Sequence, residues 1–273
     1  MRYQELLPPP ELCGLVHRIW LLRGSAAPLP APFQRAMPDG RAELIFNLAD
    51  PFECLHGEFV RRQPAALLVG PTRRAMMIRP TGVVDLIGLR FRPEALSGWL
   101  RVRGIELVDR AHAVGDLPLT LERTILEQLA AEREPGARLD MVRRHLARAF
   151  SDARFDRRLG AAVDLALADP PARPGRIAAA VGMSHRQLNR LFQERIGFGP
   201  KSLVRLGRFQ RVLRELEGPG RRSIAGVALQ AGYYDQAHLA RDFRLFAGVG
   251  AARYLRETRD LARNFIADIL GSG

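Results

Sequence analysis

The chain has 273 residues, of which 47% are hydrophobic, so it can form two hydrophobic cores and is too apolar to be disordered throughout. Its formal net charge of +13 favours a polyanionic partner, either nucleic acid or an anionic membrane. No run of about 18 apolar residues and no hydrophobic signal core are present, so we expect no membrane span and no secretion. Only Cys13 and Cys54 are cysteines, too few for a disulfide framework, and we expect a cytoplasmic protein.

The amino-terminal part, residues 1–116, predicts short β-strands separated by proline and glycine. We expect strands at 15–22, 42–48, 66–69, 75–78 and 83–91. Pro38-Asp39-Gly40 predicts a turn, and Thr81-Gly82 predicts a hairpin that joins the last two strands. A helix should follow from Pro93 to about residue 102. The pattern is typical of a small β-barrel or sandwich with helices. Together with the carboxyl-terminal part described below, it predicts an effector or oligomerisation domain.

Residues 117–152 predict a helical connector. Two amphipathic helices are separated by the breaker Glu134-Pro135-Gly136. Their apolar rows are Leu121, Ile125 and Leu129 in one helix, and Leu139, Val142, Leu146 and Phe150 in the other. Such a pair is either a docking or dimerisation surface or a packed connector, and the sequence leaves both open.

The carboxyl-terminal part, residues 153–260, predicts helices only, with a tail at 261–273. Two stretches in it repeat at an offset of 51 positions, and each has the pattern of a helix-turn-helix unit. Ser184 matches the cap Asp235, and Arg190 matches Arg241. Between the units, a helix over 200–217 would be about 27 Å long. Successive major-groove segments on one face of B-DNA lie about 34 Å apart, so this helix is a suitable spacer between two reading helices.

The positive charge lies where the repeat lies. Residues 154–263 hold 21 basic and 10 acidic residues, whereas the remaining 163 residues carry a net charge of only +2. Lys201 is the only lysine, and a general preference for arginine would not confine the charge to one part of the chain. The distribution favours double-stranded DNA as the partner.

The second helix of each unit presents residue types that can read bases. Apolar positions 188, 191, 192 and 196 share one face, as do 239, 243 and 246, so the opposite faces should point outward. Arginine can bind guanine and asparagine can bind adenine through two hydrogen bonds, and an alanine can contact the thymine methyl group. The alternative is that these side chains only form a solvated helix face. The sequence disfavours this alternative, because the cap, the apolar positions and the arginine recur in both units.

These residues carry a resemblance to a known family. Gly182-Met183-Ser184, the Leu188-x-Arg190-Leu191-Phe192 stretch, Gly197-Phe198-Gly199-Pro200 and Gly232-Tyr233-Tyr234-Asp235-Gln236 resemble the DNA-binding domain of the AraC/XylS regulators over about residues 155–256. The resemblance implies a seven-helix domain with two helix-turn-helix motifs. It departs from the family pattern at Gly248-Val249-Gly250-Ala251, where a proline is usual, which raises the question of how the last helix docks.

The resemblance also implies roles for single residues. The implied base-reading residues are Arg186, Asn189, Arg190, Gln236, Ala240 and Arg241. The candidate phosphate contacts are Arg173, Lys201, Arg205, Arg221, Arg222 and Arg253. RNA polymerase and a second copy of the chain are further candidate partners of such a regulator.

The segment from Pro38 to Leu48 looks like a sensory-domain motif of such regulators. We therefore expect a small-molecule effector or a dimer interface in the amino-terminal part. The candidate pocket residues are Arg35, Glu43, Asn47, Arg90 and Arg92, which could equally be ordinary strand-surface residues.

Other functions were weighed against this interpretation. An enzyme or metal site is disfavoured because His17, His56 and His112 form no metal-binding spacing, and we predict no metal, cofactor or catalytic residue. A DNA-binding protein with a reactive thiol, as in repair methyltransferases, remains the alternative, with Cys54 beside His56 as its candidate nucleophile. A membrane-surface role would need broad apolar helix faces, which the sequence does not show. The preferred interpretation is a bacterial transcription regulator without enzymatic activity.

Overall fold

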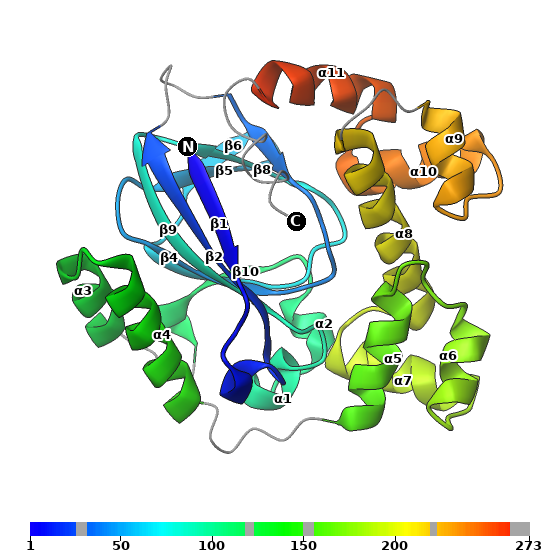
Figure 1. Ribbon diagram of the computed structural model, residues 1–273, viewed down its shortest axis with the longest axis horizontal. Helices are drawn as coiled ribbons and strands as arrows, with labels where there is room; N and C mark the ends of the chain where they lie inside the picture. Colours follow the sequence, from blue (N-terminus) through cyan, green and yellow to red (C-terminus); the bar gives the residue numbers. More distant parts are fainter. Residues whose placement is uncertain (26–31, 118–122, 150–155, 219–222, 263–273) are drawn as a thin grey trace.

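The computed structural model describes residues 1–25, 32–117, 123–149, 156–218 and 223–262. A β-rich part lies beside an all-helical part, and the long helix α8 (Pro200–Glu217) runs along their boundary (Figure 1). The fold is therefore the α+β arrangement expected from the sequence.

The β-rich part is a sandwich of two antiparallel sheets. Within the described residues no strand pairing joins the two sheets into a closed barrel. The first sheet contains, in spatial order, β1 (Arg2–Leu6), β2 (Val16–Ser25), β9 (Val83–Phe91), β4 (Glu43–Asn47), β7 (Ala66–Val69) and β10 (Ala111–Ala113). The second sheet contains β3 (Gln34–Ala36), β8 (Met76–Pro80), β5 (Phe52–His56) and β6 (Phe59–Arg62).

The predicted hairpin at Thr81-Gly82 is wrong. The strands on either side of it, β8 and β9, belong to different sheets, so this connection crosses from one sheet to the other. Strand β9 pairs instead with β2 and β4, which come from distant positions of the sequence. Local turn signals identify a change of direction but not the partner of the following strand, and this caused the error.

Each face of the first sheet has its own apolar layer. One face carries the fully buried Phe46, Ile87 and Leu89 and is covered by helices. The opposite face carries Leu22 and Leu86, which share a cluster with Phe52 of the second sheet. The short helices of this part are η1 (Pro10–Leu12), α1 (Leu96–Leu100), α2 (Gly104–Leu107) and η2 (Val114–Asp116).

The helical connector consists of α3 (Arg123–Ala131) and α4 (Pro135–Ala149). Ile125, Leu129, Val142 and Leu146 are buried in the core below the first sheet. The buried Arg138 of α4 also forms an ion pair with Asp85 of β9, at 2.6 Å between Nη1 and Oδ2. Of the two alternatives, the structure favours a packed connector, since the apolar rows are already covered; Leu121 and Phe150 lie outside the described residues.

The helical part has seven helices in the described residues, as the resemblance implied. They are α5 (Arg157–Leu167), α6 (Pro174–Ala180), α7 (His185–Arg195), α8, α9 (Ile224–Gln230), α10 (Gln236–Ala247) and α11 (Ala251–Ala262). Two apolar clusters fill this part, one around α5–α7 and the other around α9–α11, and α8 contributes residues to both. Figure 1 shows the two groups of helices at opposite ends of α8.

The last helix docks although the usual proline is absent. Tyr254 of α11 is buried, and its ring centroid lies 5.5 Å from that of Phe243 in α10. Its hydroxyl hydrogen bonds to Glu217 at the end of α8. These contacts of Tyr254 anchor α11 without a proline at position 251.

Candidate functional site

Each helix-turn-helix unit is fixed by a cap at the start of its second helix. In the first unit, Ser184 and Gln187 form the predicted capping box, so two backbone N–H groups at the start of α7 are satisfied. In the second unit the carboxylate of Asp235 accepts a hydrogen bond from the backbone N–H of His238, at 2.6 Å. The second helices thus begin at the residues that the sequence predicted.

The inward faces of both second helices are buried as expected. Leu188 and Phe192 of α7 and Leu239 and Phe243 of α10 are at most 1% exposed. Packing of these side chains fixes the rotation of each helix about its own axis. The residues on the opposite faces are consequently directed to solvent.

The structure brings the predicted base-reading residues onto these outer faces. Arg186, Asn189, Arg190, Gln236 and Arg241 are exposed, and Ala240 is half-buried. The ion pair of Arg190 with Glu194 is long, at 3.9 Å, and its side chain is 75% exposed. A pair of this length on a solvated face is worth little, so it leaves the guanidinium available to a stronger partner.

Both reading helices touch the β-rich part at their carboxyl-terminal ends. Beyond the end of α7, a β-carbon added to Gly104 of α2 would lie 2.4 Å from the backbone nitrogen of Gly197. At the end of α10, the carbonyl oxygen of Phe246 accepts from the backbone N–H of Ala75 at 2.7 Å, and that of Ala247 accepts from Arg35 Nε at 3.1 Å. The amino-terminal ends, which carry most of the predicted base-reading residues, are therefore left open to solvent in both units.

The candidate phosphate contacts divide into three groups. Arg173, Lys201 and Arg253 are exposed, and Arg253 also pairs with Glu257 at 2.7 Å. Arg205 has another partner, because its Nη2 lies 2.5 Å from Oδ1 of the buried Asp242 in α10. The hydrogen bond to Asp242 raises the pKa of Arg205, so we assign this residue to the internal structure of the domain. Arg221 and Arg222 lie outside the described residues.

The register of the repeat needs a correction. The first helices, α6 and α9, correspond at an offset of 50 positions, because both the helix starts and the backbone hydrogen bonds that close the turns match at that offset. The offset of 51 applies to the second helices only. The turn of the second unit is therefore one residue longer than that of the first.

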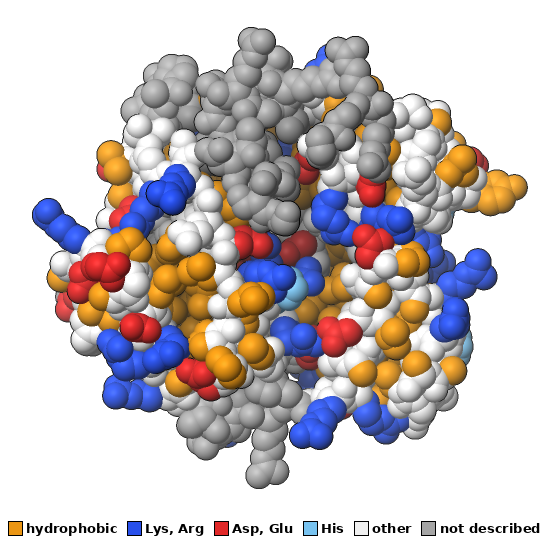
Figure 2. All heavy atoms as spheres, viewed as in Figure 1, with side chains coloured by type: hydrophobic (Ala, Val, Ile, Leu, Met, Phe, Trp, Pro, Cys, Tyr) orange, Lys and Arg blue, Asp and Glu red, His pale blue; other side chains and the backbone are white. Residues whose placement is uncertain are grey.

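A cavity of about 390 Å³ lies between the two sheets and is lined on one side by the helical part. Apolar side chains such as Leu22, Ile45 and Phe52 line it from the sandwich. Gln210 and Glu217 of α8 and Tyr254 of α11 line it from the other side. Its size is within the range of small-molecule sites. Figure 2 shows a hollow between the two halves of the molecule in which basic and acidic side chains and a histidine gather.

Four of the five residues predicted for a pocket line this cavity. They are Arg35, Glu43, Asn47 and Arg90. Arg92 does not line it, and its guanidinium joins Glu94 at 2.6 Å and Asp164 of α5 at 2.8 Å. Arg92 therefore links the sandwich to the helical part outside the cavity.

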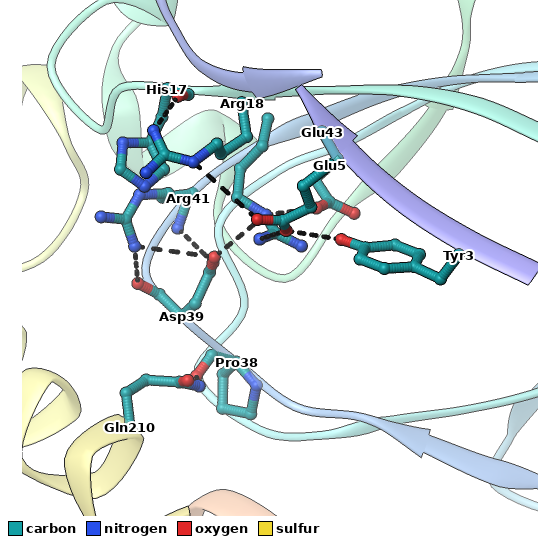
Figure 3. A network of polar contacts seen from close by, with 10 residues as sticks. Tyr3, Glu5, His17, Arg18, Pro38, Asp39, Arg41, Glu43 and Gln210 are labelled. Carbon is teal, nitrogen blue, oxygen red and sulfur yellow. Dashed lines mark hydrogen bonds and ion pairs between the residues drawn. The ribbon is translucent and has the colours of Figure 1, made fainter. Parts of the chain in front are cut away.

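One wall of the cavity is a network of charged groups (Figure 3). Arg90 Nε lies 2.7 Å from Glu43 and 3.4 Å from Asp39, and its Nη1 lies 3.3 Å from Glu5. Arg41 also pairs with Asp39, at 3.7 Å, and burial lowers the pKa of Arg41. Arg18 pairs with Glu5 at 3.8 Å, so three arginines face three carboxylates and the network is balanced in charge.

The predicted turn Pro38-Asp39-Gly40 connects this wall to helix α8. Asp39 belongs to the network, while the carbonyl oxygen of Pro38 accepts a hydrogen bond from Gln210 Nε2 of α8, at 2.6 Å (Figure 3). Gly40 has a φ of +79°, and a β-carbon there would lie 2.7 Å from Leu203 of α8. A change in the cavity wall can therefore reach the helix that separates the two units through this turn.

Sequence reasoning missed the contributions of the helical part to the cavity. Gln210, Glu217 and Tyr254 lie on helices that were assigned to DNA binding alone. Burial raises the pKa of Glu217, consistent with its position in this enclosed space. An amphipathic pattern shows that these side chains lie on one face of a helix, but it does not reveal that a second domain covers that face.

The structure disfavours the reactive-thiol alternative. Cys54 is buried in β5, and burial raises the pKa of its thiol. A nucleophilic cysteine needs the opposite shift, toward the thiolate. Its neighbour Glu53 pairs with Arg79 at 2.7 Å, so that arginine does not stabilise a thiolate at Cys54.

Metal-binding side-chain groups and membrane-spanning helices are both absent from the described residues. Among them, no group of three histidine, cysteine, aspartate or glutamate side chains is placed to hold a metal ion. No helix in the described part of the chain has the length and apolar composition of a membrane span.

Comparison with known families identifies both halves of the chain. Residues 177–257 match the family described as a helix-turn-helix domain, and residues 4–113 match a domain of unknown function (DUF6597). The carboxyl-terminal part is thus a helix-turn-helix DNA-binding domain. This domain is of the AraC type, as the sequence motifs implied. No similar protein was found among curated sequences.

Solved structures of regulators are similar to parts or most of the chain. ToxT from Vibrio cholerae is 10% identical, with a TM-score of 0.49, over 94% of this chain and 98% of that chain. Unsaturated fatty acid-bound wild-type ToxT from strain SCE256 is 12% identical, with a TM-score of 0.47, over 82% and 89% of the two chains. A transcriptional regulator from Chromobacterium violaceum with an AraC-type DNA-binding domain is 29% identical, with a TM-score of 0.35, over 40% and 95%.

Proposed function

We propose that the chain is a sequence-specific regulator that reads two adjacent major-groove segments of one duplex with α7 and α10. The supporting observation is that both helices touch the β-rich part at their carboxyl-terminal ends and expose their amino-terminal ends. In helix-turn-helix proteins the amino-terminal residues of the recognition helix contact the base edges. The readers would be Arg186, Asn189, Arg190, Gln236, Ala240 and Arg241, and the exposed Arg173, Lys201 and Arg253 would contact phosphates.

Selection of duplexes from a random pool by the full chain tests the DNA-binding proposal. We expect enrichment of one sequence class, with an affinity that falls steeply as salt concentration rises. A pool that remains random after repeated selection would contradict sequence-specific binding.

We also propose that residues 1–116 act as an effector domain whose ligand site is the cavity. The support is its enclosure by both parts of the chain and the path from Asp39 through Pro38 to Gln210 of α8. A molecule bound there would contact α8 and change how firmly the two units are held. For the rest of the chain we propose a connector at residues 117–152, a DNA-binding domain at residues 153–260 and a tail at residues 261–273.

A cavity-filling variant tests the effector proposal. The low-molecular-weight fraction of a cell extract should change the affinity of the wild type for its selected duplex. Ile45→Trp, which places a larger ring in the cavity, should abolish that response while leaving affinity for DNA measurable. A response that persists in a folded Ile45→Trp chain would contradict the assignment. Sedimentation of the same samples tests the alternative, that the amino-terminal part forms a dimer.

A further inference from the structure

The turn of the second helix-turn-helix unit contains one residue that the first unit lacks. Four residues, 181–184, separate α6 from α7, whereas five residues, 231–235, separate α9 from α10. In the two turns, the backbone N–H of Met183 bonds to Ala178 and that of Tyr233 bonds to Ala228, each at 2.9 Å. Met183 therefore corresponds to Tyr233, and the added residue is Tyr234.

The two consecutive tyrosines point in opposite directions. Tyr233 is 3% exposed; its ring packs against His238, and its hydroxyl lies 3.3 Å from Asp242. Tyr234 is 89% exposed, and the following cap Asp235 is extended, with φ −151° and ψ 172°. Tyr233 is thus anchored in the core, whereas Tyr234 is directed to solvent.

The exposed tyrosine lies next to the end of α10 that would enter the groove. It directly precedes the cap of this helix, whose first turn carries the base-reading candidate Gln236. A residue just outside a helix that points into the major groove lies beside the sugar-phosphate backbone at the edge of that groove. Tyrosine hydroxyls are among the groups that bind phosphate oxygens in protein–DNA complexes.

The caps of the two units explain why the second unit needs such a donor. The first unit begins its reading helix with the neutral Ser184, so the positive end of the helix dipole is available to a phosphate. The second unit begins with the carboxylate of Asp235, which repels a phosphate at the same place. A neutral hydroxyl at the end of the Tyr234 ring can reach a phosphate at a greater distance from that carboxylate.

From this geometry we infer that Tyr234 is a DNA-backbone contact of the second unit, binding one phosphate through its hydroxyl group. The inference rests on the proposed function, in which α10 enters the major groove. Because tyrosine is neutral, the contact adds affinity without displacing a counterion. It therefore differs from an arginine contact, whose removal lowers the salt dependence of binding by about one unit of slope.

The test compares Tyr234→Phe with the wild type on the duplex selected by the wild type. Loss of the hydroxyl should weaken binding about tenfold, near the lower end of the range for a hydrogen bond to a charged group, because the site is solvated. The loss should be equal on the selected duplex and on point-mutated duplexes, and the slope of affinity against salt should not change. Leu229→Ala is the matched control, since Leu229 is 66% exposed on α9 of the same unit, and it should bind like the wild type.

Replacement of single phosphates by methylphosphonates locates the contact. At one phosphate of the second half-site the replacement should weaken the wild type and cause no additional loss in Tyr234→Phe. Wild-type affinity of both Tyr234→Phe and Tyr234→Ala would overturn the inference. Normal DNA binding with reduced transcription in vitro would also overturn it, because the tyrosine would then contact RNA polymerase. If the wild type itself selects no duplex, the proposed function fails together with the inference.

Discussion

The two helix-turn-helix units have the same shape but different supports. The first unit meets the β-rich part through close apolar packing, in which Val108, just after α2, belongs to the hydrophobic cluster of that unit. The first unit also has one ion pair with it, between Arg92 and Asp164. The second unit meets it through more polar groups, with Arg35 bonded to Ala247 and Glu257 and Ala75 bonded to Phe246, and through the side chain of Met37. A tightly packed apolar contact loses its packing when the two surfaces shift, whereas a polar group can exchange one hydrogen-bond partner for another. If the cavity holds an effector, as proposed, the second unit is the one whose position we expect the effector to change.

The interiors of the units differ in the same way. At the position where the first unit has Leu191, the second has Asp242, which is 1% exposed and is bonded to Arg205 and Tyr233. A buried carboxylate needs such partners to offset its loss of hydration. The second unit therefore depends on a specific set of polar contacts that the first does not have.

The largest expected effect comes from breaking the close packing of the first unit. Gly197 has a φ of +83°, and an added β-carbon would lie 2.4 Å from Val108 and 2.7 Å from the backbone of Gly104. We expect Gly197→Ala to lower the free energy of unfolding by about 3 kcal/mol or more, measured by urea denaturation.

Gly248 provides the matched control in the second unit. It has a φ of +74°, but no atom lies within 4 Å of an added β-carbon. Gly248→Ala should therefore cost only the backbone strain, about 1 kcal/mol. Equal losses for the two variants would show that the contact with Gly104 contributes nothing to stability.

The next effect separates structure from DNA binding at Arg205. Removal of this partner leaves Asp242 buried with only Tyr233, so Arg205→Ala should destabilise the chain by about 2–3 kcal/mol. The salt dependence of DNA binding should stay the same. Unchanged stability with a shallower salt dependence would restore Arg205 to the phosphate contacts.

Paired alanine variants test whether both units read bases. Arg190→Ala and Arg241→Ala should each reduce discrimination against point-mutated duplexes by about 1–3 kcal/mol, because each removes a candidate contact to base edges. Competition binding with a panel of single-base variants measures the loss. If one variant keeps the selectivity of the wild type, the helix that carries it does not read bases through that arginine.

The smallest effect concerns His17 of β2, which lies beside the arginines of the charged network (Figure 3). Burial and the charges of Arg41, Arg18 and Arg90 lower the pKa of His17 to about 3, from its ordinary value of 6.5. The neutral imidazole therefore contributes stability above pH 6.5 that is lost as the pH falls toward 3. After allowance for its partial exposure we expect a loss of about 1 kcal/mol between pH 7.5 and pH 5.

His17→Asn, which cannot take up a proton, isolates this contribution. Its thermal stability should depend less on pH than that of the wild type over the same interval. Identical pH profiles for the two chains would show that His17 does not couple protonation to folding.

The sequence predicted the helical part well because its signals are local. Ser184 with Gln187, Asp235, and the prolines at 174 and 200 mark helix starts through short-range chemistry. The capping residues and the apolar rows also occur in both units, so the prediction of one unit supported the prediction of the other. The one error in this part, the register of the first helices, arose from the single added residue in the second turn.

The β-rich part was harder to predict because its pairings are not local. Strand β6 has four exposed residues and shows no alternation of apolar and polar side chains, so it was missed. Of the candidate pocket residues, all but Arg92 line the cavity, and the partner of Arg92, Asp164, lies in α5. The cavity depends on side chains from α8 and α11, and contacts between distant elements leave no periodic signal in the sequence.

Hydroxyl-radical footprinting of the full chain on its selected duplex tests the central claim most directly. The account predicts two protected patches on one face of the duplex, with centres about one helical turn, 10–10.5 base pairs, apart. Arg190→Ala should weaken one patch and Arg241→Ala the other. A single patch, or two patches on opposite faces of the duplex, would contradict the claim that α7 and α10 read neighbouring major grooves.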